Sequence, residues 1–462
     1  MAARLRTKEL SARQVLDAHL RQIALVNPKV NAIVTLVEDD ARKAALRADN
    51  AAVGGEFLGP LHGLPIAHKD LAETKGIRTT FGSPIFAGYV PNFSTLLVER
   101  AQAAGAITIG KTNTPEFGAG SQTFNRVFGS TKNPWDLNKT CGGSSGGAAV
   151  ALACGMLPLA DGSDFGGSLR NPAAFCSVVG FRPSPGRVPN LPSLNAWSPL
   201  SVVGPMARTV EDVALFLSAI AGPDPRAPLS IHAHFAQPLR RDCKNLRIAW
   251  CPDFAGLPFD SHITEVIQAQ RAKFEHLGCI TEDANPDFAG ADESFKTLRA
   301  LSFFLQLGAL SSEQRAQTKS TVVDEIERGS RLTGPDIAAA ETHRSRLFAR
   351  IGAFMTRYDF LVLPVTQVPP FPIEDEDVRE IAGTKMDTYV DWMRSCYYIS
   401  MTGLPAISVP AGFTPAGLPV GLQIVGRHHD DWGVLQIAHA FQQISRVPSG
   451  AQQVRDLTAH LG

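Results

Sequence analysis

Short apolar runs alternate along the chain with segments whose apolar residues recur every three to four positions. The runs rich in β-branched or other apolar residues predict strands at 106–112, 246–250, 359–364, 406–411 and 420–426. The helical spacing is clearest at 94–105 and 209–222. This alternation is typical of an α/β chain, in which helices cover both faces of a mixed or parallel sheet.

The domain organisation is ambiguous from length alone, because 462 residues exceed the usual size of one hydrophobic core. Large α/β folds nevertheless often form one domain. No repeat of about 20 to 50 residues recurs, and no segment is polar enough to be a disordered linker. The stretch 223–240, rich in Pro, His and Ala, is the most linker-like. We interpret it as the entry to a variable substrate-pocket insertion, from about 232 to 350, within one fold.

The charge balance bears on which partners the protein can bind, and the cysteine content bears on the compartment in which it is found. The 44 Lys+Arg balance 44 Asp+Glu, which argues against binding to nucleic acid or to a membrane surface through a basic field. The first residues predict an amphipathic helix rather than a signal peptide, with Ser11 as its N-cap and Gln14 completing a capping box. The seven cysteines form no C-x-x-C pair, so we expect no disulfide framework and a cytoplasmic protein.

Two clusters rich in glycine and serine lie close together, separated by an apolar run. In the second cluster, Gly166 and Gly167 lack a Cβ atom, so backbone N–H groups can converge there on one small oxygen. Such N–H groups form an oxyanion hole, and Ser168 beside them is a candidate nucleophile that still needs a base.

The first cluster, GGSSG, also fits the G-x-S-x-G nucleophile elbow of Ser-His esterases. An elbow requires a strand before it and a helix after it, whereas the preceding residues 129–141, with their Asn, Pro, Lys and Asp, predict a loop. An esterase in which Ser144 or Ser145 works with a C-terminal histidine, such as His428 or His439, therefore stays as an alternative.

Three motifs, in this order along the chain, resemble the signature of the amidase signature family, serine hydrolases that cleave C–N bonds. They are HGLPIAHKD with Lys69, CGGSSGG with Ser144 and SDFGGSLR with Ser168. Blocks such as NPWD, VVGFRPSPGRVP and TGLPAISVPAGF extend the resemblance over nearly the whole chain. It implies one three-layer α/β/α domain over 1–462 with a central mixed sheet, and it points to the bacterial stand-alone branch of aryl acylamidases and urethanases.

By similarity to the family, Lys69 is the base, Ser144 is a relay that follows a cis peptide bond after Gly143, and Ser168 is the nucleophile. A base must be neutral, whereas an ordinary lysine is protonated at neutral pH. The apolar neighbours in LPIAHKDLA favour a lowered pKa through desolvation. Because a carboxylate beside the ammonium would raise the pKa again, we predict that Asp70 faces elsewhere.

The resemblance also assigns the residues around the nucleophile. The oxyanion hole would be formed by the N–H groups of Phe165, Gly166 and Gly167, with that of Ser168 itself as a further candidate. Ser163 would hydrogen-bond the triad, and Asp164 and Arg170 would order the loop.

No metal or organic cofactor is required by this chemistry. The histidine stretches HAH, at 232–234, and HHDD, at 428–431, lack a partner at ligand spacing, which favours surface loops over a metal site.

The expected substrate is a small amide of a hydrophobic or aromatic acid or amine, or a carbamate (urethane), which presents the same carbonyl. Phe165 stands where many members carry a smaller or polar residue and favours a narrow or aromatic-preferring site. Further candidates for the pocket, which at helical spacing are more typical of core, are Phe303, Phe304, Trp392, Tyr397 and Tyr398.

Two other functions and the assembly stay open. A glutaminase like the catalytic subunit of tRNA-dependent amidotransferases is disfavoured, because that subunit typically has Lys-Pro-Thr-Tyr-Gly where this chain has RPSPG at 182–186. A catalytically dead binding module is disfavoured by the intact Lys69, Ser144 and Ser168. The oligomeric state is not indicated by the sequence, and a homodimer remains a candidate.

Overall fold

A single sheet of 11 strands runs through the part of the chain that the computed structural model describes, residues 1–448 except 234, 236 and 255. The strands lie in the order β1-β3-β2-β8-β10-β9-β16-β17-β13-β11-β12. Their bounds are β1 Ile33–Leu36, β2 Pro65–Lys69, β3 Ile107–Thr112, β8 Leu159–Asp164, β9 Val179–Arg182, β10 Val202–Ala207, β11 Arg247–Trp250, β12 Ile280–Asp283, β13 Phe360–Pro364, β16 Ala406–Phe413 and β17 Pro419–Gly426. β2 is parallel to β3 and β8, whereas β10 is antiparallel to β8 and β9, so the sheet is mixed.

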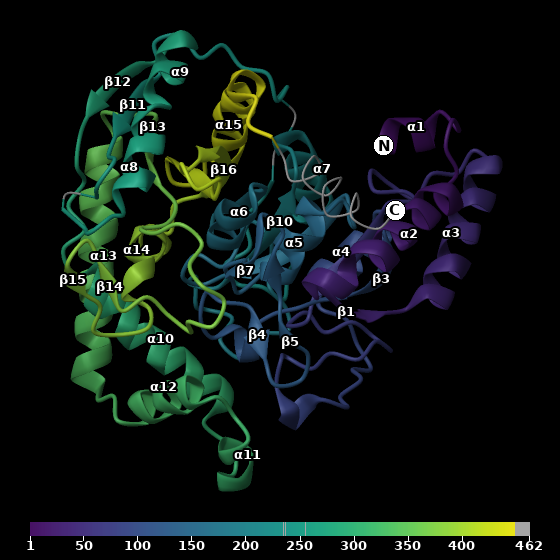
Figure 1. The fold of residues 1–462 in the computed structure, drawn as a ribbon, viewed down its shortest axis with the longest axis horizontal. Helices are drawn as coiled ribbons and strands as arrows, with labels where there is room; N and C mark the ends of the chain where they lie inside the picture. The colour runs from purple at the N-terminus through teal and green to yellow at the C-terminus, as the bar shows by residue number, and fades with distance from the viewer. Residues whose placement is uncertain (234, 236, 255, 449–462) are drawn as a thin grey trace.

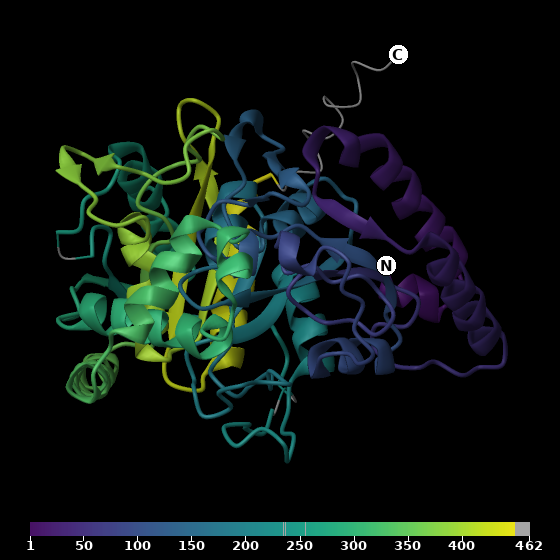
Figure 2. The ribbon, with the colours of Figure 1, turned by 90° about the horizontal axis from the view of Figure 1, so that it is seen from below.

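Helices from all parts of the chain flank this sheet. They are α1 Ala2–Arg6, α2 Ala12–Val30, α3 Glu38–Val53, α4 Leu96–Ala103, α5 Gly146–Ala153, α6 Arg170–Cys176, α7 Val210–Ile220, α8 Ser261–Gln268, α9 Arg271–His276, α10 Ala291–Leu307, α11 Ser312–Ala316, α12 Ser320–Ser330, α13 Gly334–Met355, α14 Arg394–Thr402 and α15 Asp431–Ser445. The N-terminal α2 and α3 lie at one end of the molecule, and α10 to α13 lie at the other (Figures 1 and 2). The mixed α/β architecture expected from the sequence is confirmed.

The strands and helices that the hydrophobic pattern predicts are all present. The five predicted strands correspond to β3, β11, β13, β16 and β17, and the two predicted helices correspond to α4 and α7. Helix α2 begins with the expected capping box, in which Ser11 Oγ accepts from Gln14 N at 3.0 Å and Ser11 N donates to Gln14 Oε1 at 2.9 Å.

The stretch 232–350 is not a simple excursion from the sheet. It supplies β11 and β12, which form one edge of the sheet, as well as α8 to α13. The organisation as a single domain and the variable character of this stretch stay predictions.

The prediction of a loop at 129–141 was wrong. Two short strands, β6 Lys132–Asn133 and β7 Asp136–Thr140, pair there as a hairpin outside the central sheet. Asn133 stabilises it, because its side-chain amide donates to the carbonyl oxygens of Thr140 and Phe175, each at 2.9 Å. The backbones of these polar residues therefore pair as strands, and the Asn133 side chain adds hydrogen bonds that the sequence pattern does not reveal.

The centre of the molecule is built on two helices whose residues are all buried. Helices α5 and α6 pack on each other and on the central strands, α5 on β8 and β10 and α6 on β16 and β17. Helix α5 carries no polar side chain, which is typical of such a position, whereas α6 buries Arg170 and Asn171 as well. The seven cysteines are free thiols and buried. No helix within the described residues has the length and apolar character needed to cross a membrane.

Candidate active site

Lys69 lies at the end of β2 with its side chain buried against three hydroxyl groups. Its Nζ lies within hydrogen-bond distance of Ser144 Oγ at 2.7 Å, of Ser145 Oγ at 3.0 Å and of Ser163 Oγ at 3.1 Å. Burial lowers the pKa of Lys69 to about 7, although the charges of Asp164 and Asp161 oppose the shift. A large share of this amine is therefore neutral at neutral pH.

Asp70 faces away from this amine, as predicted. Its carboxylate accepts from the backbone N–H of Thr80 at 3.1 Å and from the Thr80 hydroxyl, and it interacts with the charge of Lys111. Lys111 in turn donates to Thr74 Oγ1 at 3.1 Å and to Thr79 Oγ1 at 3.2 Å. Asp70 therefore belongs to a second buried cluster, which orders the chain after β2.

Ser144 lies two residues before α5, in a turn whose backbone carbonyl groups accept hydrogen bonds from neighbouring side chains. The peptide bond between Gly143 and Ser144 is cis, as the family resemblance implies. Ser121 Oγ donates to the Gly143 carbonyl at 2.7 Å. Close packing explains the glycines at the start of α5, since a Cβ on Gly147 would lie 2.3 Å from the backbone nitrogen of Asn113.

Ser168 lies in the tight turn between β8 and α6. The backbone N–H of Ser145 donates to the Ser168 carbonyl at 3.2 Å, so the two glycine-serine clusters lie against each other. Gly167 has a φ of +121°, and a Cβ there would lie 2.5 Å from Cys396 Cβ. Only glycine fits this close approach.

One expected member of the oxyanion hole is already engaged. The N–H of Gly167 donates to Asp164 Oδ1 at 2.9 Å, so it points at this carboxylate. The sequence did not indicate this, because the direction of an N–H group depends on the turn rather than on residue type. A role of the Phe165, Gly166 and Ser168 N–H groups toward an oxyanion stays a prediction.

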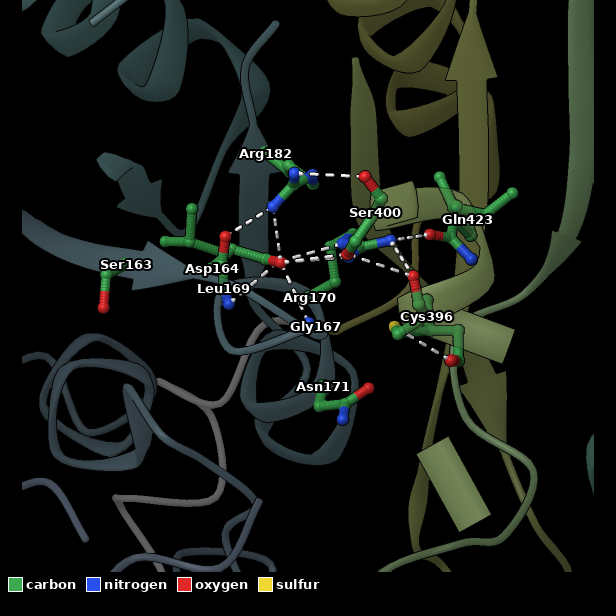
Figure 3. Close-up of polar contacts among 12 residues, drawn as sticks. Ser163, Asp164, Gly167, Leu169, Arg170, Asn171, Arg182, Cys396, Ser400 and Gln423 are labelled. Atoms are coloured by element: carbon green, nitrogen blue, oxygen red, sulfur yellow. Dashed lines mark hydrogen bonds and ion pairs between the residues drawn. The ribbon is translucent and has the colours of Figure 1, made fainter. Parts of the chain in front are cut away.

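Asp164 and Arg170 belong to a fully buried network beside the turn between β8 and α6 (Figure 3). Asp164 pairs with Arg170 and with Arg182, each at 3.0 Å. Arg170 continues to the second half of the chain, donating to Ser400 Oγ at 2.7 Å and to Gln423 Oε1 at 2.5 Å. Burial raises the pKa of Asp164, but the two guanidinium groups outweigh burial and hold the pKa well below its usual range. Asp164 also accepts from the backbone N–H groups of Gly167 and Leu169, so these contacts connect the loop to the rest of the molecule.

A cavity of about 140 Å³ opens beside Ser144, Ser163 and Ser168. Its apolar lining comes from Leu71, Phe117, Phe165, Phe295, Phe303 and Met393. Its other polar side chains include Arg299, Ser302 and Gln306, all on α10. The three hydroxyl groups therefore open into a chamber that has both aromatic and polar side chains in its wall.

The histidines that an esterase would need lie elsewhere. No histidine is among the described residues that line the cavity. His439 Nε2 lies 2.9 Å from Glu211 Oε1, and the ring of His428 stacks on that of His429. Although a strand, β7, does precede Ser144, the base that a Ser-His elbow requires is not at Ser144 or Ser145.

Pocket residues were the weakest part of the sequence interpretation. Of the five aromatic candidates, Phe303 lines the cavity, Trp392 and Tyr397 are buried in the core, and Phe304 is exposed. Tyr398 borders a different hollow. The positions missed, 295, 299, 302 and 306, recur on α10 with Phe303 at helical spacing, so an amphipathic face was the available signal.

The two histidine stretches show no metal-binding arrangement in the part of the chain that is described. No group of three His, Cys, Asp or Glu side chains there could hold a metal ion. Asp431 is engaged structurally, since it pairs with Arg187 at 2.9 Å and accepts from the Ser184 N–H at 2.7 Å. His234 lies outside the described residues.

A family model described as Amidase matches residues 14–435. The chain belongs to the amidase signature family. It is 36% identical over 450 residues to an acylamidase from Rhodococcus erythropolis, covering 96% of this chain and 94% of that protein. It is 37% identical over 467 residues to a glutamyl-tRNA(Gln) amidotransferase component from Geobacillus kaustophilus, covering 95% of each. As an amidase, the chain is an amide-cleaving hydrolase.

Solved structures of this amidase family share the fold, and their similarity to this chain differs in degree. A bacterial aryl acylamidase of the amidase signature family superposes with a TM-score of 0.92 at 28% identity, covering 98% of this chain and 97% of that chain. The corresponding glutamyl-tRNA(Gln) amidotransferase component from Thermotoga maritima superposes with a TM-score of 0.76 at 26% identity, covering 95% and 94%. The backbone of this amidase is thus more similar to that of the acylamidase.

Proposed function

We propose that this amidase cleaves amides through an acyl-enzyme, with Ser168 as the nucleophile, Ser144 as the relay and Lys69 as the base. The observation that carries the proposal is the contact of Lys69 Nζ with Ser144 Oγ at 2.7 Å, made by an amine whose pKa is lowered to about 7. Such an amine can take a proton at neutral pH, which an ordinary lysine cannot do efficiently.

In the first half of the reaction, Ser168 Oγ attacks the carbonyl carbon of the substrate. The Ser168 proton passes to Ser144 Oγ as the Ser144 proton passes to Lys69 Nζ. Backbone N–H groups of Phe165, Gly166 and Ser168 stabilise the resulting oxyanion. When the C–N bond breaks, the proton returns from Lys69 through Ser144 to the leaving amine.

In the second half, a water molecule attacks the acyl-enzyme ester. Its proton follows the same route to Lys69, and the ester bond to Ser168 breaks as Ser168 Oγ regains a proton. The acid is released and the three groups return to their starting state. Ser163, 3.1 Å from Lys69 Nζ, helps to hold the amine in place throughout.

Aryl amides and carbamates are the substrates we propose. Support comes from the aromatic lining of the cavity, from Phe117, Phe165, Phe295 and Phe303, and from the acylamidase and aryl acylamidase relatives. A carbamate would place the same carbonyl group beside Ser168. A cytoplasmic location and a homodimer stay predictions.

A glutaminase of the amidotransferase type is the second candidate, because amidotransferase relatives reach similar sequence identity. The lower TM-score to the amidotransferase structure, 0.76 against 0.92, and the RPSPG sequence at 182–186 count against it. Ammonia release from glutamine, measured beside release of aniline from acetanilide, separates the two. We expect aniline and no ammonia.

The decisive test of the mechanism is labelling with a fluorophosphonate probe followed by peptide mass spectrometry. We expect the label on Ser168, lost in Lys69→Ala and in Ser144→Ala because both interrupt proton transfer from the nucleophile. A label on Ser144 or Ser145 that persists in Lys69→Ala would contradict the proposal.

A further inference from the structure

The catalytic cavity is closed on one side by a face of α10 that carries an arginine. Arg299, Ser302 and Gln306 lie along this face, with Phe295 and Phe303 beside them. The Arg299 side chain is only 7% exposed, so its charge is held in the wall of the cavity rather than in bulk water. A charge in that position bears directly on which substrates can enter.

Arg299 is neutralised by a carboxylate from a neighbouring helix. Its Nη1 lies 2.9 Å from Glu325 Oε1 on α12, and the Glu325 side chain is only 9% exposed. The guanidinium also lies over the rings of Phe303, at 4.5 Å, and Tyr389, at 5.3 Å. The Tyr389 hydroxyl donates to Glu325 Oε1 at 3.4 Å. The pair is therefore packed against aromatic rings and carries no net charge.

The size of the cavity limits what it can take. At about 140 Å³ it is close to the engineered protein cavity of about 150 Å³ that binds benzene. It has room for a group of the size of one ring. Gln306 Nε2 donates to Ser302 Oγ at 3.0 Å, which leaves the Ser302 O–H as a donor beside the guanidinium.

A larger chamber continues outward from this cavity and shares Leu71, Phe117 and Phe165 with it. Its volume is about 570 Å³, and Phe81, Phe86, Phe93 and Leu194 contribute apolar surface to it. Glu73 is the one charged side chain among its described lining residues, and it accepts from the Tyr89 hydroxyl at 3.0 Å. The outer chamber thus offers no cation to an anionic substrate either.

We propose that the substrate carries no anionic group on either side of the scissile bond, and that one side is a single uncharged ring, or a group of similar size, with a neutral hydrogen-bond acceptor facing Arg299. Glu325 makes this selection. A carboxylate on that ring would lie beside the Glu325 carboxylate as well as the guanidinium, and an ammonium would meet Arg299. A neutral acceptor can accept from Arg299 without disturbing the pair. This inference rests on the proposed function.

The test compares matched arylamides that differ only in one charge. On the amine side the pair is 4-acetamidobenzamide and 4-acetamidobenzoate. On the acyl side it is the anilides of 4-carbamoylbenzoic acid and of 4-carboxybenzoic acid. Hydrolysis is followed by chromatography. In the wild-type enzyme we expect kcat/KM to be at least about tenfold higher for the neutral member of each pair.

Glu325→Gln frees the guanidinium and should raise kcat/KM about tenfold for the anionic member of the pair whose ring enters the inner cavity. The matched control is Glu327→Gln, which removes an exposed carboxylate from the same helix and should leave every ratio unchanged. A wild-type preference for the anionic members would overturn the inference. So would a folded Glu325→Gln enzyme with unaltered ratios.

A double variant keeps the test usable if Glu325→Gln fails to fold. Arg299→Met with Glu325→Leu replaces the whole pair by apolar side chains, a change that folded proteins often tolerate. We expect the wild-type enzyme to prefer 4-acetamidobenzamide to acetanilide, because only the former offers an acceptor to Arg299, and we expect the double variant to lose this preference. Retention of that preference would contradict the role of Arg299.

Failure of the inference and failure of the proposed function give different results. If acetanilide is cleaved by the wild-type enzyme but not by Ser168→Ala, and if the kcat/KM ratios of neutral to anionic substrates are the same in Glu325→Gln, only the charge selection is overturned. Absence of cleavage of every arylamide by the wild-type enzyme overturns the arylamide function, and the inference with it.

Discussion

The turn that carries Ser168 and the α10 wall both border the cavity, but they are built in different ways. Around Ser168, each charged group has several polar partners, as Asp164 has in Arg170, Arg182 and the N–H of Gly167. On α10, one compensated pair, Arg299 with Glu325, is surrounded by aromatic rings. The first arrangement fixes atoms for chemistry. The second sets the size of the cavity and the charge of its wall. We therefore expect substitutions on α10 to alter substrate preference more than the reacting groups.

Removal of the nucleophile should give the largest effect and separates the two regions most clearly. We expect Ser168→Ala to lower kcat by about 10⁴-fold or more for every amide, because the covalent step is lost. Lys69→Ala should produce a loss of similar size, since the two residues act as one unit. Steady-state kinetics on acetanilide measures both. Activity of Ser168→Ala within tenfold of wild type would show that another group attacks the carbonyl.

Breaking the ion network under the turn should reduce stability as well as activity. Arg170→Met leaves the buried Asp164 with a single guanidinium partner and removes the links to Ser400 and Gln423. We expect the free energy of unfolding to fall by about 3 to 5 kcal/mol. Urea denaturation followed by circular dichroism measures it.

The control for that loss is Arg226→Met, which breaks an ion pair whose arginine is 63% exposed. We expect its free energy of unfolding to change far less than that of Arg170→Met, because solvent screens an exposed ion pair. Equal losses in the two variants would contradict the view that the Asp164 network stabilises the fold more than the exposed Arg226–Asp224 pair does.

The same contrast explains what the sequence could predict. Strand and helix patterns predicted β16, β17 and α7, because hydrophobic spacing is a local property. Lys69, Ser144 and Ser168 could be proposed from the sequence because they lie in short contiguous motifs, and the structure brings Lys69 and Ser144 together. The sequence predicted neither the direction of the Gly167 N–H nor the β6–β7 hairpin. The N–H points at the Asp164 carboxylate, and the hairpin carries a hydrogen bond from the Asn133 side chain, and such contacts leave no hydrophobic pattern. The α10 wall depends on where a distant helix packs, and no local motif records that.

The pH dependence of the reaction should reveal the charge around Lys69. Because only the neutral amine acts as a base and its pKa is about 7, kcat/KM should rise as pH increases through about 7 and then level off. Asp161 raises this pKa, so Asp161→Asn should move the rise to lower pH, by roughly one pH unit.

The control variant is Asp39→Asn, an exposed carboxylate at the start of α3, for which we expect no change in the pH profile. Asparagine can still accept the Lys69 backbone N–H that Asp161 Oδ1 accepts at 2.9 Å, so the geometry of β2 should persist. A shift toward higher pH in Asp161→Asn would contradict the assignment of Lys69 as the titrating base.

The smallest expected effect tests the α10 wall at adjacent residues. Phe303 lines the cavity and its ring lies 4.5 Å from the Arg299 guanidinium, whereas Phe304 is 38% exposed and is not among the cavity-lining residues. We expect Phe303→Ala to raise the KM for acetanilide about three- to tenfold with little change in kcat, because ring contacts with bound substrate are lost while the triad is untouched. Phe304→Ala should leave both constants near their wild-type values. If the two variants raised KM equally, the face of α10 that meets the substrate would have to be reassigned, whereas a large fall in kcat for Phe303→Ala alone would mean that the wall also positions the reacting carbonyl.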